Sequence, residues 1–204
     1  LMAGSWGTLG VLTEVTIKVL PAARTELTLL VFGRDEARAG EAMTLALNTP
    51  AEVSGAAHLP RLTAGRAPLR SEMAVTALRL DGFEASVAAR ADHLAVALKA
   101  FGRVEQLDGR HSREFWAQVR EVEAFHKAPR PLWRISVPPA VGWHVTQDLV
   151  GEALYDWGGG LVWLLSDSDP ALVRRAVRAL GGHATLYRGD GPAFEPLEGP
   201  LAAL

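Results

Sequence analysis

The stretch GSWGTLGVLTEVTIKVLP, residues 4–21, combines a glycine-rich turn with a strand pattern. Its three glycines are spaced by three, and glycine lets a backbone turn sharply and approach a ligand without a Cβ in the way. Apolar and polar residues then alternate over residues 11–20, which predicts a half-buried strand that ends at Pro21. The dinucleotide-binding fingerprint has a different glycine spacing and precedes a helix. By composition alone, the segment fits either a structural turn or a loop that contacts a phosphate or a flavin.

Beyond this stretch, the hydrophobic pattern predicts one order of strands and helices that occurs twice along the chain. The order strand, helix, strand, strand, helix occurs twice, and a strand closes the second round. This order predicts an α+β fold whose two β-α-β-β-α units, with ferredoxin-like halves, form a mainly antiparallel sheet with helices on one face. The predicted strands are 25–32, 52–57, 73–80, 132–137, 153–157, 161–166 and 183–188, and the predicted helices are 35–47, 84–101, 113–125 (with Ser112 as its cap), 140–150 and 170–180.

Composition excludes several classes of protein. The 204 residues contain 21 Lys and Arg against 23 Asp and Glu, so the formal net charge of −2 argues against a nucleic-acid partner. The absence of cysteine excludes a disulfide framework and a thiol nucleophile. No apolar run approaches the roughly 18 residues of a transmembrane segment, and the first residues do not resemble a signal peptide. We therefore expect a cytoplasmic protein.

Residues 4–21 closely resemble the end of the FAD-binding domain in the vanillyl-alcohol-oxidase (PCMH-type) family of FAD-linked oxidases. Within this family, three later stretches are similar to the FAD-binding subunits of bacterial glycolate oxidases and occur in the same order. These stretches are LWRISVP (132–138), DWGGGLVW (156–163) and GGHATLYR (181–188).

The resemblance implies a division of the chain into three parts. Residues 1–21 would be the last strand of a truncated FAD-binding domain, 22–188 a cap or substrate domain, and 189–204 an irregular segment leading back to the FAD domain. FAD would be the cofactor of the full-length protein, but we do not expect this chain to retain it alone. The residues implied to lie along FAD are Gly4, Ser5, Gly7, Thr8, Leu9, Gly10 and Val11.

Four residues of the predicted cap are candidates for binding a small 2-hydroxy acid: Arg134, Trp133, Trp157 and Arg188. An arginine fork suits a carboxylate, but it also suits an ion pair within the cap. Large aromatic residues can line a pocket beside a flavin, and they also build cores and interfaces. Both interpretations remain open for each residue.

Catalytic and metal-binding residues are not indicated. The six histidines show no local metal-ligand spacing. The H-x6-H pair and the N-L-H motif of hydroxy-acid-oxidising family members are absent from the sequence. We therefore predict no metal site and assign no catalytic residue.

The resemblance implies a fragment of an FAD-dependent 2-hydroxy-acid (glycolate) oxidoreductase subunit, with the cap shaping the substrate side of the flavin. A first alternative is a non-catalytic subunit that assembles with a related flavin-bearing catalytic subunit and an iron–sulfur subunit, and that contacts a membrane only through the complex. A second alternative is a small-ligand binding α+β module. That module predicts an opening strand with a hydrophobic core on both of its sides.

Overall fold

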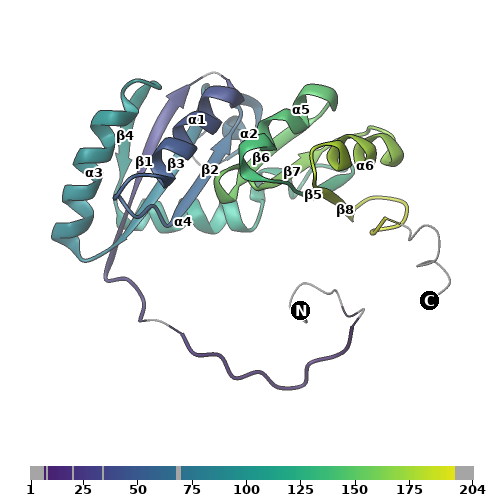
Figure 1. Ribbon diagram of the computed structural model, residues 1–204, viewed down its shortest axis with the longest axis horizontal. Coiled ribbons are helices and arrows are strands. Elements are labelled where there is room, and N and C mark those ends of the chain that lie inside the picture. Colours follow the sequence, from purple (N-terminus) through teal and green to yellow (C-terminus); the bar gives the residue numbers. More distant parts are fainter. Residues whose placement is uncertain (1–6, 8, 20, 34, 68–69, 196–204) are drawn as a thin grey trace.

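The computed structural model describes residues 7, 9–19, 21–33, 35–67 and 70–195. Its centre is one eight-stranded sheet in the order β4-β1-β3-β2-β6-β7-β5-β8, and all strand pairings are antiparallel (Figure 1). The strands are β1 (Thr25–Gly33), β2 (Gly55–Leu59), β3 (Ala74–Gly82), β4 (Arg103–Leu107), β5 (Leu132–Ser136), β6 (Glu152–Asp156), β7 (Leu161–Leu165) and β8 (His183–Arg188). The predicted α+β class with an antiparallel sheet is confirmed.

The described residues form six α-helices and three short 3-10 helices. The α-helices are α1 (Glu36–Leu47), α2 (Arg61–Arg66), α3 (Glu84–Leu98), α4 (Gly109–Arg120), α5 (Val145–Asp148) and α6 (Pro170–Ala179). The 3-10 helices are η1 (Glu123–Phe125), η2 (Pro139–His144) and η3 (Trp157–Gly159).

The sheet consists of two units with the same topology. The first unit has the strand order β4-β1-β3-β2, and the second has the equivalent order β8-β5-β7-β6. The units meet where β2 pairs with β6, in register at His58 and Tyr155. This arrangement confirms the predicted repeat of β-α-β-β-α units.

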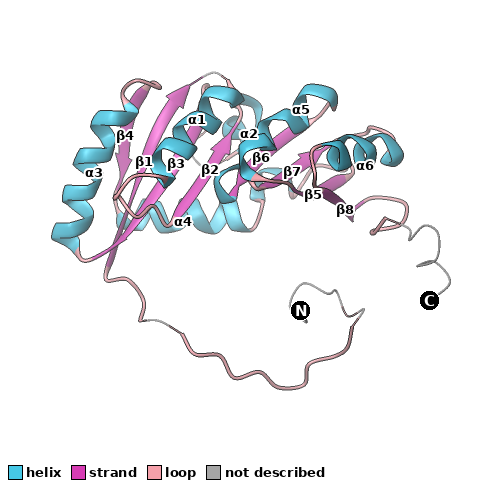
Figure 2. Ribbon diagram, viewed as in Figure 1, coloured by secondary structure: helices cyan, strands magenta, loops and turns pink. Residues whose placement is uncertain are grey.

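The helices of the two units, α1, α3, α5 and α6, pack against one face of the sheet. Their apolar sides join two clusters, one built on β1 and β3 and the other on β5, β6 and β7. The additional helices α2 and α4 pack with η1 against the opposite face in a third cluster. Figure 2 shows α4 running behind the strands that α1 and α3 cover in front. On this opposite face, α2, α4 and η1 therefore cover the strands of the first unit, while the strands of the second unit are more exposed.

The structure adds two elements to those predicted. Strand β4 closes the first unit at the sheet edge, where its charged, half-exposed side chains give no clear apolar alternation. Helix α2 occupies the predicted loop 60–71.

The start of α4 also differs from the prediction. It begins at Gly109, because the Asp108 side chain caps it by accepting from the N–H groups of Arg110 and His111. Ser112, predicted as the cap, is instead fully buried.

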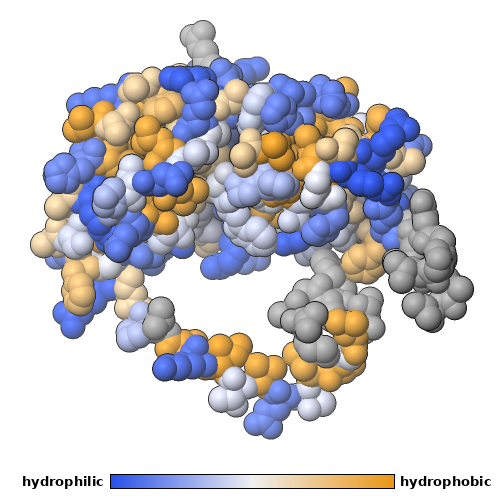
Figure 3. Space-filling view, in the orientation of Figure 1, coloured by the Kyte–Doolittle hydropathy of each residue, from blue (hydrophilic) through white to orange (hydrophobic). Residues whose placement is uncertain are grey.

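The opening segment lies outside the sheet. Residues 9–19 form neither helix nor strand, so the strand predicted over 11–20 is not formed in the described residues. Val11 is 85% exposed and Ile17 72% exposed, and the apolar side chains of this segment stand apart from the body (Figure 3). No strand of the sheet accompanies the segment, so it lacks the ladder hydrogen bonds that a strand needs.

Candidate functional site

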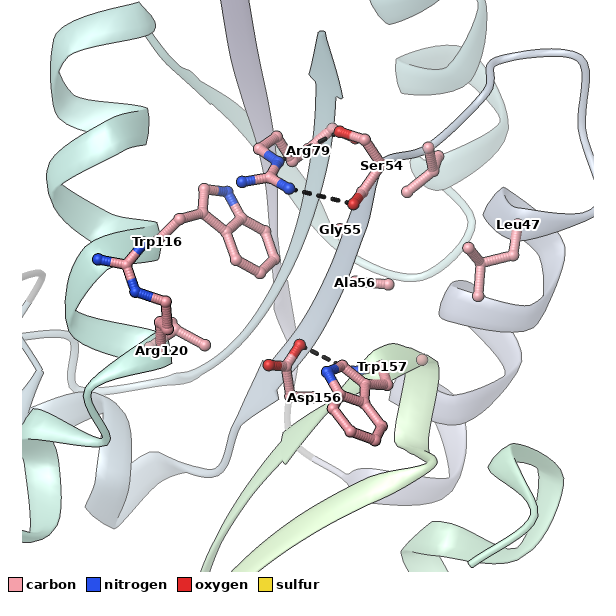
Figure 4. A pocket seen from close by; sticks show the side chains of 12 residues that line it. Leu47, Ser54, Gly55, Ala56, Arg79, Trp116, Arg120, Asp156 and Trp157 are labelled. Carbon is pink, nitrogen blue, oxygen red and sulfur yellow. Dashed lines mark hydrogen bonds between the residues drawn. The ribbon is translucent and has the colours of Figure 1, made fainter. Parts of the chain in front are cut away.

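A groove of about 530 Å³ lies on the α4 side of the sheet, where the cover of α4 ends and the second unit begins (Figure 4). Elements from both units form it: the end of α1, the loop before β2 and β2 itself, strand β3, the C-terminal part of α4, and the end of β6 with the turn after it. The lining residues are Leu47, Val53, Ser54, Gly55, Ala56, Arg79, Trp116, Val119, Arg120, Asp156, Trp157 and Gly158.

Arg79 supplies a fixed positive charge in the groove. Leu78 and Leu80 of β3 face the α1 and α3 cluster, so the alternation of the strand turns Arg79 to the α4 side. Its Nε donates to Ser54 Oγ and its Nη2 to the Ser54 carbonyl oxygen, both at 3.2 Å. Its carboxylate partner Asp81 lies 4.0 Å away, so the ion pair is loose. The guanidinium therefore keeps donor capacity for an anion in the groove.

Trp116 forms one wall of the groove. Its ring centre lies 5.2 Å from the guanidinium carbon of Arg79, a distance typical of a cation–π contact. Trp116 is 8% exposed, so its side chain lies on the buried side of α4.

Asp156 and Trp157 form the opposite wall, at the C-terminal end of β6. Burial raises the pKa of Asp156, while a hydrogen bond from the backbone N–H of Trp157 and the charge of Arg79 partly oppose this increase. That hydrogen bond is 2.7 Å long. Trp157 is 58% exposed and has a φ of 54°, which is uncommon for a residue other than glycine. Strained backbone of this kind occurs often at binding sites.

The groove thus combines two arginines, Arg79 and Arg120, with a half-buried carboxyl group and two indoles. The guanidinium can bind a carboxylate through two parallel hydrogen bonds. The carboxyl group can accept a hydrogen bond from a hydroxyl group, and the indoles can cover an apolar or planar part of a ligand. The arrangement suits a small hydroxy acid.

Of the four predicted substrate-binding residues, Trp157 lines the groove and Arg134 lies beside Trp157. The guanidinium carbon of Arg134 lies 5.3 Å from the ring centre of Trp157, which lines the groove. Arg134 makes no ion pair or hydrogen bond with the residues that the structure describes, so the alternative of an ion pair within the domain is not observed there.

The other two predicted residues lie elsewhere. Trp133 is 1% exposed and packs in the core on the α6 side, with the Arg174 guanidinium carbon 5.4 Å from its ring centre. Arg188 donates to the carbonyl oxygen of Phe125 at 2.9 Å and, more weakly, to those of His126 and Arg130. Both contacts tie elements of the fold together.

The predicted FAD-contacting residues lie in the opening segment. Gly7, Leu9, Gly10 and Val11 are exposed, and none lies in a helix or strand. The predicted residues Gly4, Ser5 and Thr8 lie outside the described residues.

Sequence reasoning missed Arg79, Arg120 and Asp156. Arg79 is the one charged residue in the predicted strand 73–80, whose other residues except Thr76 are apolar, and this contrast was an available signal. Asp156 begins the quoted stretch DWGGGLVW, but nothing in its spacing pairs it with Arg79. The two residues meet only because β2, which lies between β3 and β6, joins the two units.

The described residues offer neither a metal site nor a membrane-spanning helix. No group of three or more His, Asp or Glu side chains there could hold a metal ion. No helix in this part of the chain is long and apolar enough to cross a membrane.

Comparison with solved structures defines the class of fold. The chain superposes on 4-ethylphenol oxidase of Gulosibacter chungangensis, in complex with isoeugenol, and on p-cresol methylhydroxylase with bound substrate. Each match has a TM-score of 0.50 and 14% identity, and covers 83% of this chain and 46% of the other. At this identity the likeness shows the fold alone, namely an α+β fold built on one antiparallel sheet. No protein-family model matches the chain.

Comparison with curated proteins is more specific. The chain is 36% identical over 205 residues to glycolate oxidase subunit GlcE of Escherichia coli (strain K12), and the match covers 98% of this chain. It covers 49% of GlcE, so the chain spans about half the length of this relative. The chain is homologous to the C-terminal half of GlcE. The family resemblance predicted from residues 4–21 and the later stretches is confirmed.

Proposed function

We propose that this chain is the cap region of an FAD-dependent 2-hydroxy-acid (glycolate) oxidoreductase subunit. In this role it covers the substrate side of the flavin and binds the hydroxy acid in the groove. Homology to GlcE supports the glycolate assignment. The observation that carries the proposal is the groove itself, where Arg79 and Asp156 face the same space between two indoles.

The opening segment is compatible with binding to FAD. Gly7 has a φ of 80°, and a Cβ at this position would meet no heavy atom within 4 Å. Residues 9–11 are exposed and belong to no helix or strand, so their backbone N–H and carbonyl groups are available. Gly4, Ser5, Gly7, Thr8, Leu9, Gly10 and Val11 would hold FAD, and 1–21 would complete its domain. When bound, FAD would accept a hydride from the hydroxy-acid carbon.

Within the groove, the residues of the chain have distinct tasks. The Arg79 guanidinium binds the substrate carboxylate. The Asp156 carboxyl group accepts the hydrogen bond of the substrate hydroxyl group and orients it. Trp157, with Arg134 stacked on its ring, limits the access of water from the open half of the sheet. Their contribution is to position the substrate and to exclude water.

Glycolate titration tests the anion site. Isothermal titration calorimetry of the 204-residue chain should show one saturable site. Arg79→Met should weaken glycolate binding by about tenfold or more, because the bidentate charged contact is lost. Arg61→Met, which removes an exposed arginine outside the groove, serves as the control and should bind like the parent. Equal affinity of the parent and Arg79→Met would contradict the assignment.

A non-catalytic assembly subunit is the second candidate. It would lie beside a related flavin-bearing catalytic subunit and an iron–sulfur subunit of a glycolate oxidase complex. It is favoured by the sequence, which contains neither the H-x6-H pair nor the N-L-H motif of hydroxy-acid-oxidising family members. Arg134→Ala in the assembled complex separates the candidates. Loss of turnover with intact assembly supports the substrate role, and loss of assembly supports the scaffold.

The third interpretation, a self-contained ligand-binding module, requires the opening strand inside the core. Residues 9–19 are instead exposed along their length. This observation disfavours the module.

A further inference from the structure

A chain of hydrogen bonds runs from the wall of the groove to the start of β1. The indole Nε1–H of Trp116 donates to Thr28 Oγ1 at 2.8 Å. Thr28 Oγ1 lies 2.8 Å from Ser112 Oγ, and the Ser112 hydroxyl donates to Glu26 Oε1 at 2.6 Å. Thr28 and Ser112 are both 0% exposed, so water does not compete for these bonds.

Chemistry fixes the direction of every bond in this chain. An indole N–H only donates, and a carboxylate only accepts. Ser112 donates its hydrogen to Glu26, so its oxygen must accept from Thr28. Thr28 in turn accepts from Trp116. All three donors thus point toward Glu26, and reversing the Thr28–Ser112 bond would cost one of the others. Buried chains of this kind hold one arrangement of side chains, since leaving a member unpaired is expensive.

The ring of Trp116 is also confined by packing. A Cβ built on Gly55 would lie 3.2 Å from Cη2 of the indole, closer than nine in ten Cβ contacts in proteins. Arg79 pairs with Gly55 in the β2–β3 register, and its guanidinium lies over the Trp116 ring. A rotation of the indole would therefore also move the guanidinium.

We propose that Glu26, Thr28 and Ser112 are positioning residues that set the ligand affinity of the groove from outside it. None of the three lines the groove. They hold the Trp116 indole, which holds the Arg79 guanidinium at the place where a carboxylate binds. This inference rests on the proposed function in one respect only, namely that the groove binds a small carboxylate.

Thr28 variants test the proposal. Thr28→Val keeps the shape of the side chain and removes both hydrogen bonds, whereas Thr28→Ser keeps the hydroxyl group. At a temperature where all variants are folded, Thr28→Val should weaken glycolate binding about three- to tenfold by calorimetry, which is the range of one or two lost hydrogen bonds. It should also change the tryptophan bands of the near-ultraviolet circular dichroism spectrum. Thr28→Ser should restore both parent values, and a purely structural role predicts unchanged affinity in the folded protein.

Two further variants keep the test independent of stability. Trp116→Phe removes the donor, so adding Thr28→Val to it should cause little further loss of affinity. Gly55→Ala lies at the groove and places a Cβ 3.2 Å from the indole and 3.4 Å from Arg79 Cβ and Nε, so it should weaken binding without touching the hydrogen-bond chain. Gly33→Ala, whose Cβ would make an ordinary 3.8 Å contact, should not.

The outcomes separate this inference from the proposed function. If the parent does not bind glycolate, the anion site is wrong, and the near-ultraviolet spectra alone decide the positioning role. An unchanged tryptophan spectrum in Thr28→Val, or unchanged glycolate affinity in a parent that binds it, would overturn the positioning role.

Discussion

At the scale of single residues, burial changes the pKa of ionisable side chains and so makes the stability of the fold depend on pH. Asp156 is the clearest case in the groove, because burial raises its pKa above the ordinary value of 3.8. The folded state therefore holds the Asp156 proton more tightly than the unfolded chain does. The contribution of Asp156 to stability is thus most favourable at low pH and becomes less favourable as the pH rises from 3.8 through the raised pKa.

Replacing this carboxyl group should stabilise the fold. Asp156→Asn retains an oxygen that can accept from the Trp157 N–H but carries no charge to desolvate. We expect a higher free energy of unfolding at pH 7, and a gain that disappears toward pH 3, measured by urea denaturation at both pH values. Asp148→Asn, at an exposed position of α5, is the control and should change stability little. Glycolate affinity should fall in Asp156→Asn if the carboxylate accepts the substrate hydroxyl group.

His58, at the junction of the two units, should give the stability of the fold the opposite pH dependence. Its ring is 2% exposed, and burial lowers its pKa from 6.5 to about 4, partly opposed by the charge of Asp35. Between these values the unfolded chain binds a proton that folded His58 does not, so stability is lost as the pH falls from 6.5 toward 4. The loss from this residue is about 3 kcal/mol at most. His58→Gln should flatten the pH dependence of unfolding in this window, and parallel curves for the variant and the parent would contradict it.

At the scale of elements, close backbone contacts hold the turn that carries Trp157. A Cβ on Gly142 of η2 would overlap the carbonyl oxygen of Gly159 in η3. Gly142→Ala should therefore separate the two short helices and destabilise the domain by about 2 kcal/mol or more, since backbone cannot yield as a side chain can. Urea denaturation measures this effect. Gly65→Ala in α2 is the matched control, because its Cβ would meet Ser71 at an ordinary 3.7 Å.

Elements with strong local signals were predictable, and elements defined by their neighbours were not. Helix α3 is predicted by the spacing of its own apolar residues, and the turn between β6 and β7 by its own run of glycines. Strand β4 exists because the edge of β1 pairs with it, and its own residues are mostly polar. Conversely, residues 11–20 have a strand pattern without a partner strand in the described chain.

The groove could not be predicted from the sequence for the same reason. Arg79 and Asp156 are 77 positions apart (156 − 79), and they come together only because β2 lies between their strands.

At the scale of the whole molecule, the two units share one of their three cores. Leu154 of β6 belongs to the second unit and is 1% exposed, yet it packs in the cluster under α4 with residues such as Phe115 and Leu59 of the first. Leu132 and Leu165 of the second unit join the same cluster. The sheet is also continuous through His58 and Tyr155. Neither unit can therefore unfold without exposing apolar surface of the other.

This shared core predicts cooperative unfolding despite the internal repeat. Leu154→Ala should lower the free energy of unfolding by about 2–5 kcal/mol, the cost of a cavity left by a buried leucine. Far-ultraviolet circular dichroism follows the whole sheet, while tryptophan fluorescence follows mainly the second unit, which holds Trp133, Trp143, Trp157 and Trp163. Both probes should give coincident urea transitions in the parent, and Leu154→Ala should shift both by the same amount. Separate transitions, or a shift confined to one probe, would mean that the two units fold independently and that the groove between them is not held rigid by the shared core.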